Sequence, residues 1–256
     1  MEYTIYVYWK KGLIAEEKDA AIRGVNNYIN ILRSTQAIGM PNDNIKLCGV
    51  DAELESFVQN LLKIRSYTNA EKICEYLDAM LPEYAIGVYL TNEPLCDNEG
   101  GYIVGLMSRL HITVSTYHFR NLSRSQRLDS IELCIMHELG HAHGMAGTYG
   151  RVNSESNHGP HCADALCLMR QPHGNFVPLI REHHDRWFCP LCLEDARLAK
   201  LSKNNFAKRR GALVGKNERM RPQRSITPKP RSFPSRLSQS SKLPPPLPPR
   251  RSGAHV

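Results

Sequence analysis

Residues 137–192 hold a dense set of potential metal ligands, and this set constrains the chain more than any other feature. It begins with His137, Glu138 and His141 in the pattern H-E-x-x-H. If the segment is helical, the two histidines lie one above the other on one face and can bind the same zinc ion. Glu138, beside the first histidine, is then placed to act on a metal-bound water rather than on the metal. The pattern therefore predicts a zinc site on a helix.

Two cysteine pairs follow the histidines. Cys162 and Cys167 form C-x-x-x-x-C, and Cys189 and Cys192 form C-x-x-C around Pro190. The first ten residues alternate like a strand and do not resemble a secretory signal, so we expect a reducing, cytoplasmic setting. Clustered cysteines in such a setting bind zinc more often than they form disulfides.

These motifs resemble the archaemetzincins, a family of zinc metallopeptidases whose signature is H-E-x-x-H-x-x-G-x-x-H-C-x-x-x-x-C-x-M followed by C-x-x-C. The resemblance implies a metzincin-like α/β fold with a mixed sheet, an active-site helix and a cysteine subdomain that binds zinc. It makes Glu138 the general base, Met169 the methionine of the turn beneath the site, and the cofactor two zinc ions per chain. The implied ligands are His137, His141 and His161 for the catalytic zinc, and Cys162, Cys167, Cys189 and Cys192 for the structural zinc.

The third histidine departs from the signature. The signature places it at position 147, where this chain has Gly147, and His161 comes fourteen residues later. Lengthening the connection from two to sixteen residues costs about 1.8 kcal/mol in loop closure, whereas structural zinc contributes about 10–16 kcal/mol in small peptides. We therefore predict His161 as the third ligand. His158 and Glu182 are alternatives, while His143 would point about 200° away from His141 on the helix.

The rest of the chain reads as alternating strands and helices, which indicates α/β layers. Asp51, and either Thr68 or Asn69, can cap helices, and the active-site helix should begin after Asn121 or Ser123. By resemblance, one of the two strands between 102 and 117 borders the cleft and pairs with an extended substrate. Strands are predicted at 4–9, 45–50, 84–90, 102–107 and 112–117, and further helices at 13–32, 52–64, 70–80 and 194–201.

The remaining cysteines are scattered and are predicted to be small core residues. They are Cys48, Cys74, Cys96 and Cys134. No stretch of the sequence is long and apolar enough to span a bilayer.

Composition changes after residue 202, so we expect a catalytic domain at 1–202, with its structural zinc region at 161–192, and a disordered tail at 203–256. Residues 201–256 hold five lysines and nine arginines against one glutamate, which gives a net charge of +13. Because the whole chain has a net charge of +8, residues 1–200 carry a net charge of −5. Pro245, Pro248 and Arg250 match a ligand of SH3-type domains. The basic charge could also attract anionic partners or serve as a nuclear address.

We expect this chain to be a zinc-dependent metallopeptidase, which the resemblance suggests acts on short peptides, as an aminopeptidase or otherwise. The alternative is a non-catalytic, zinc-stabilised interaction protein whose tail recruits partners. Glu138 distinguishes the two, because a binding module has no use for a carboxylate at that position.

Overall fold

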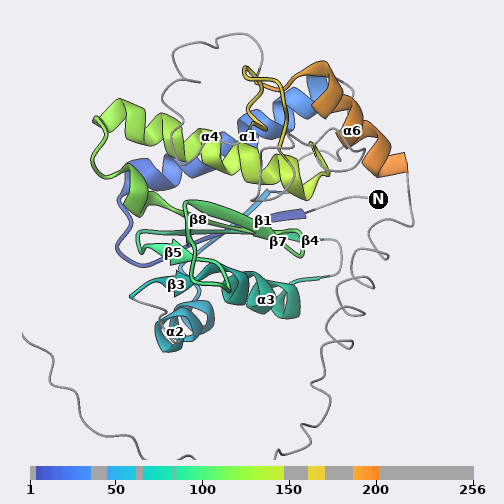
Figure 1. The fold of residues 1–256 in the computed structure, drawn as a ribbon. Helices are drawn as coiled ribbons and strands as arrows, with labels where there is room; N and C mark the ends of the chain where they lie inside the picture. The colour runs from blue at the N-terminus through green and yellow to red at the C-terminus, as the bar shows by residue number, and fades with distance from the viewer. Residues whose placement is uncertain are drawn as a thin grey trace, which may run out of the picture. The chain divides into compact units, whose positions relative to one another are not determined.

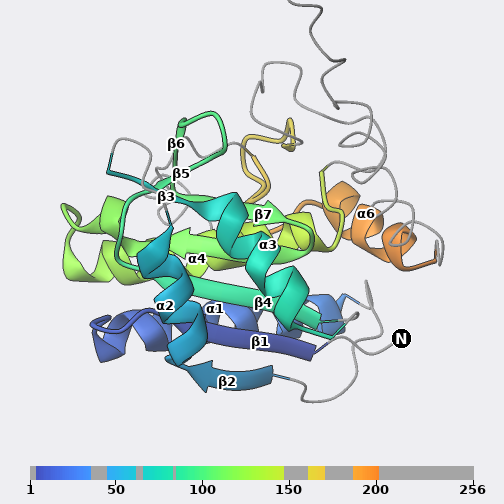
Figure 2. The same ribbon diagram turned by 90° about the horizontal axis from the view of Figure 1, so that it is seen from below.

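A central β-sheet separates two layers of helices (Figure 1). The computed structural model describes residues 4–35, 45–61, 66–82, 85–146, 161–170 and 187–201. Helices α1 (Ala15–Ser34) and α4 (Arg124–Ala142) cover one face of the sheet, and α2 (Ala52–Asn60) and α3 (Ala70–Met80) cover the other (Figures 1 and 2). Each helix buries its apolar side against the sheet, so the predicted α/β class is confirmed.

The main sheet is mixed, and its antiparallel strand forms one edge. Strands β2 (Ile45–Gly49), β1 (Thr4–Trp9), β4 (Ala85–Thr91) and β8 (His111–Ser115) pair in parallel in that order. Strand β7 (Gly105–Ser108) pairs antiparallel with β8 at the end of the sheet. All of β4 is buried, as expected for a central strand with helices on both faces. Of the two candidate strands for the edge, β7 is therefore the edge and β8 is interior.

A second, smaller sheet consists of β3 (Thr68–Asn69), β5 (Leu95–Cys96) and β6 (Tyr102–Ile103). Strand β5 is not among the predicted strands, because a two-residue strand is too short to show alternation. The predicted strand 102–107 is divided at Val104, and the predicted strand 112–117 gives way to the 3₁₀ helix η1 (Thr116–Phe119).

Side-chain caps mark where three of the helices begin. Asp51, Asn69 and Ser123 each accept a hydrogen bond from the backbone N–H three residues later, at 2.8, 3.0 and 3.4 Å. Asn69 is the cap rather than Thr68, because the Thr68 hydroxyl donates to Glu93 at 2.6 Å. The last helix of the described ranges, α6 (Pro190–Leu201), begins four residues before its predicted start. Proline at a first helical position loses no hydrogen bond, so the C-x-x-C pair forms part of the helix start.

Helices α1 and α4 approach closely at Gly24, and this contact gives a stability prediction. A Cβ at position 24 would lie 2.7 Å from the backbone oxygen of Glu132 and 3.1 Å from the Cβ of Ile135. Backbone cannot rotate away, so Gly24→Ala must push the two helices apart. We expect the overpacking to lower the free energy of unfolding by about 1–3 kcal/mol, less the roughly 1 kcal/mol of helix propensity gained.

Thermal unfolding of Gly24→Ala measures this effect. The control is Asn30→Ala, an exposed position of the same helix, which gains propensity without any packing loss. If the two variants unfold at the same temperature, the close contact at Gly24 does not limit stability.

The isolated cysteines differ in their burial. Cys74, Cys96 and Cys134 are buried, as predicted, whereas Cys48 is exposed. The prediction for Cys48 is wrong because β2 is the other edge of the main sheet, where Leu47 is also 55% exposed.

Several sequence predictions fall outside the described residues. These are the domain boundary at residue 202, the tail at 203–256 and the motif of Pro245, Pro248 and Arg250. Within the ranges that the structure describes, no helix has both the length and the apolar character to cross a membrane.

Candidate metal centre

The last turns of α4 carry the first two candidate ligands. His137 and His141 stand one turn apart with their Nε2 atoms 3.1 Å from each other. The helix ends directly after them, where Gly144 takes a left-handed φ of +83° and its N–H donates to the His141 carbonyl at 3.0 Å. Glycine adopts this conformation without strain. The H-E-x-x-H segment is therefore helical, as predicted, and both imidazoles converge.

His161 completes a triangle with these two histidines. Its ring centroid lies 5.3 Å from that of His137 and 5.1 Å from that of His141, and those two centroids are 4.7 Å apart. Nitrogens bound to one tetrahedral zinc at about 2.0–2.1 Å stand about 3.3 Å from each other, close to the 3.1 Å between the two Nε2 atoms on α4. One nitrogen from each ring lies within 4.8 Å of the others, so the three imidazoles fit a single zinc ion.

A backbone carbonyl orients the first ligand. The Nδ1 of His137 lies 2.7 Å from the carbonyl oxygen of Leu168. Because a carbonyl only accepts hydrogen bonds, Nδ1 carries the proton and Nε2 keeps its lone pair for a metal. The sequence does not indicate Leu168 as part of the site, because every residue has a backbone carbonyl and the acceptor therefore does not depend on residue type.

Burial keeps the histidines neutral. It lowers the pKa of His137 to about 4, with a smaller contribution from nearby His161. The pKa of His141 falls well below 6.5 because its ring is buried and lies beside the other two. Zinc binds the neutral imidazole, so protons compete weakly for this site.

Glu138 lies against the edge strand. Its side chain is buried, and burial raises its pKa to about 8 even though the backbone of Met107 hydrogen-bonds to it. A Cβ on Gly105 would lie 2.8 Å from Oε1 of Glu138 and 3.0 Å from the sulfur of Cys134. Only glycine at position 105 therefore lets β7 approach the carboxylate this closely. The sequence shows Gly105 without any sign of this role, which depends on packing between distant segments.

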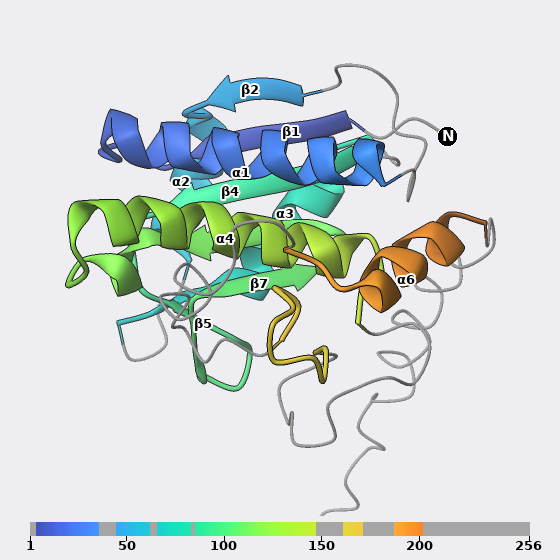
Figure 3. The ribbon, with the colours of Figure 1, turned by 90° about the horizontal axis from the view of Figure 1, so that it is seen from above.

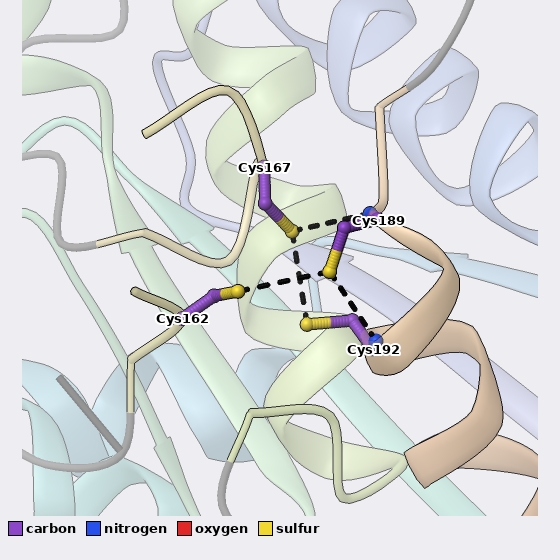
Figure 4. Close-up of side chains that lie close together, drawn as sticks. All are labelled: Cys162, Cys167, Cys189 and Cys192. Atoms are coloured by element: carbon purple, nitrogen blue, oxygen red, sulfur yellow. Dashed lines mark hydrogen bonds between the residues drawn. The ribbon is translucent and has the colours of Figure 1, made fainter. Parts of the chain in front are cut away.

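The four cysteines of the two pairs converge beside this site, and their sulfurs point toward one another (Figure 4). The Sγ–Sγ distance is 3.7 Å both for Cys162 with Cys189 and for Cys167 with Cys192. A disulfide requires about 2.05 Å, whereas thiolates bound to tetrahedral zinc at about 2.3 Å stand about 3.8 Å apart. The spacing therefore fits a four-sulfur zinc centre.

Backbone N–H groups point at three of the sulfurs. The N–H groups of Asp164, Cys189 and Cys192 donate to the sulfurs of Cys162, Cys167 and Cys189, each at 3.4 Å. Hydrogen bonds among the thiols lower the pKa of Cys162 and Cys189. The same hydrogen bonds raise the pKa of Cys167 and Cys192. Four thiolates this close need a cation, which zinc would supply.

Met169 packs beneath the histidine-bearing turn. A Cβ on Gly140 would collide with the sulfur of Met169 and lie 3.3 Å from that of Met145. Met169 is fully buried. It therefore packs against the turn that carries the histidines, and its role as the methionine of the turn stays a prediction from the resemblance.

His143 lies outside the triangle, as its position on the helix predicted. Its Nδ1–H donates to the Leu139 carbonyl at 3.0 Å, and its ring stacks at a tilt 5.3 Å from Tyr28. Burial lowers its pKa from 6.5 to about 4. Between these values the unfolded chain binds a proton that the folded chain does not, so stability falls as the pH falls through this window.

We therefore expect His143 to remove about 2 kcal/mol of stability between pH 7 and pH 5. The His143→Gln variant lacks this titrating group, so its free energy of unfolding should change less than that of wild type between pH 7 and pH 5. Urea unfolding of both proteins at each pH, with equal metal content, measures the difference. Parallel pH dependence of the two proteins would show that His143 titrates normally.

The two alternative third ligands, His158 and Glu182, lie outside the described residues. Among the residues that are described, the ligand atoms gather into two groups, and these contain all seven predicted ligands.

Comparison with solved structures gives the same architecture at low sequence identity. The archaemetzincin of Methanopyrus kandleri has a TM-score of 0.55 and 20% identity, over 78% of this chain and 96% of that one. The archaemetzincin of Archaeoglobus fulgidus, in complex with malonate, has a TM-score of 0.52 and 14% identity, over 76% and 99%. A zinc-dependent peptidase of Methanocorpusculum labreanum has a TM-score of 0.52 and 17% identity, over 75% and 99%.

No protein-family model and no curated protein matches the sequence. The structural match, however, spans nearly the full length of each of the three solved structures. We conclude that this chain has the archaemetzincin fold.

Proposed function

We propose that this protein is a zinc-dependent metallopeptidase with one catalytic and one structural zinc ion. The observation that carries the proposal is the position of Glu138. Its buried carboxylate stands one residue from His137 in a three-imidazole site, and on its other side lies the backbone of an edge strand. The archaemetzincins and the zinc-dependent peptidase that share the fold support it.

In this proposal, zinc held by the three histidines would polarise a peptide carbonyl and lower the pKa of a water molecule. The protein supplies the proton transfers. Glu138 accepts a proton from the attacking water and passes it to the leaving amine. Glu138 belongs to neither ligand group, so its carboxyl group is free for this step. Its pKa of about 8 lies close to the pKa near 7 of a zinc-bound water, so the proton can pass between them without a large free-energy difference.

Strand β7 is the part of the fold that we propose binds substrate. It pairs with β8 on one side and forms the end of the main sheet on the other. Gly105 of this strand packs against the Glu138 carboxyl group, so this edge lies directly beside it. An extended peptide that adds to the edge as a further strand would place a backbone carbonyl near the histidines. We further propose that short peptides are the substrates, with an aminopeptidase mode as the first to test.

The test uses full-length protein purified with zinc under reducing conditions. Elemental analysis should find about two zinc per chain. Peptide pools with free and with acetylated N-termini are then incubated with the protein and analysed by mass spectrometry. Loss of residues only from free N-termini indicates an aminopeptidase, and internal cleavage of both pools indicates an endopeptidase.

If fully loaded protein cleaves neither pool, the alternative of a zinc-stabilised interaction protein gains support. The SH3-type motif of Pro245, Pro248 and Arg250, the anionic partners of the basic tail and the cytoplasmic or nuclear location stay predictions from the sequence.

A further inference from the structure

One short segment joins the two candidate metal centres. Residues 161–170 contain no helix and no strand of either sheet, yet the two groups that they supply to the histidine triangle, the His161 ring and the Leu168 carbonyl, each lie next to a cysteine of the sulfur centre. His161 directly precedes Cys162. The Leu168 carbonyl, which orients His137, directly follows Cys167.

The segment is closed on itself at the same two cysteines. The N–H of Cys162 donates to the Met169 carbonyl at 2.8 Å, and the N–H of Cys167 donates to the Asp164 carbonyl at 3.1 Å. The N–H of Leu168 donates to the Trp187 carbonyl at 2.7 Å, which ties the segment to the residues just before α6. Figure 3 shows this segment and the start of α6 together beside the end of α4.

We propose that the four-cysteine centre positions the histidine site, so that metal must bind the cysteines before the three histidines can bind metal tightly. The proposal rests on the two-zinc part of the proposed function but not on peptide hydrolysis. Cys162 and Cys167 are in this sense positioning residues for His161 and His137.

The physical reason is conformational entropy. A ten-residue segment without a helix or a strand loses much backbone freedom when it is ordered. A metal bound to Cys162 and Cys167 of the segment, and to Cys189 and Cys192 at the start of α6, fixes this segment to a helix. With the segment fixed, His161 and the Leu168 carbonyl are already in place for a second metal. Without that link, binding at the histidines must itself order the segment.

We expect loss of the cysteine centre to weaken metal binding at the histidines about 100-fold, at the upper end of the range for outer-shell residues. Metal affinities at the two centres are linked reciprocally, so metal at the histidines also strengthens binding at the cysteines. Mutations at the start of α6 can test the link, because Cys189 and Cys192 are far in sequence from both His161 and Leu168.

The experiment is a Co²⁺ titration of metal-free, reduced, full-length protein. Thiolate-to-cobalt charge transfer in the near ultraviolet reports the cysteine centre, and visible absorption without that band reports the histidine centre. Wild type should bind two ions. The double variant Cys189→Ser/Cys192→Ser should lose the charge-transfer band and bind cobalt at the histidines about 100-fold more weakly. Serine is itself a good N-cap residue, so the start of α6 keeps a cap.

Cys48→Ser is the matched control, because Cys48 is an exposed cysteine outside both groups, and it should titrate like wild type. Circular dichroism establishes that each variant is folded. If the double variant keeps wild-type cobalt affinity at the histidines, the proposal is overturned.

If the double variant does not fold, an insertion replaces it. Two glycines between residues 161 and 162 leave all seven ligands in place but loosen the link between the centres. The charge-transfer band should remain while affinity at the histidines falls about 100-fold. Unchanged affinity there overturns the proposal. Protein that binds two ions and cleaves no peptide would count against the peptidase alone, since this titration does not depend on hydrolysis.

Discussion

Replacing Glu138 by glutamine is expected to slow peptide hydrolysis by about 10²- to 10⁴-fold, the range that a positioned proton-transfer group supplies. Glutamine has the same shape but cannot accept a proton from water. The side chain is 7% exposed and lies against Gly105, so the substituted amide should occupy the same place. Metal content should not change, because Glu138 does not belong to either ligand group. Initial rates and zinc content measured on the same sample test both statements.

The matched control is Glu132→Gln, the same chemical change on the same helix. Glu132 accepts hydrogen bonds from Arg23 and Asn27 of α1, on the side of α4 that faces that helix. We expect this variant to keep near wild-type activity. A Glu138→Gln enzyme that is fully active with full zinc content would exclude Glu138 as the base, and the proposed mechanism with it.

Replacing His161 by alanine is expected to reduce bound zinc from two ions per chain to one and to abolish hydrolysis. Two imidazoles on α4 would remain, and the loss of a direct ligand should weaken binding more than the 10- to 100-fold typical of outer-shell changes. The cysteine centre should stay filled, since Cys162 and its three partners are unchanged. Zinc content after dialysis against a weak chelator measures the loss.

Two further variants complete this test. His118→Ala removes a histidine that packs against Tyr102 and lies outside the triangle, so it should keep two zinc ions. His158→Ala addresses the alternative ligand that the sequence left open. If His158→Ala loses a zinc ion and His161→Ala does not, the third ligand has been assigned to the wrong histidine.

Local patterns predicted much of this structure. The first strand has its predicted limits, and the caps at Asp51 and Ser123 lie where the sequence places them. The helical spacing of His137 and His141 also follows from sequence alone, because each of these features depends on residues within a few positions of one another. The ligand set, including His161, came from the family resemblance, and the structure brings all seven side chains into two groups.

The other parts of the site depend on contacts between distant segments. Composition cannot show that β7 is the edge strand, since the residues of β7 and β8 look alike in hydrophobicity. Composition also cannot show that Gly105 makes room for the Glu138 carboxyl group, or that the Leu168 carbonyl sets the tautomer of His137. Cys48 was wrongly predicted to be buried for the same reason, because only strand order shows that β2 is an edge.

By itself, the sequence determined the chemistry available to this protein: two imidazoles and a carboxylate on one helical turn, and two pairs of thiols. The tertiary structure alone decided how these groups meet, because a helix sets distances only along its own length. His161 and Cys162 are chain neighbours, yet they belong to different centres, and only the packing of residues 161–170 between α4 and α6 gives each its partners.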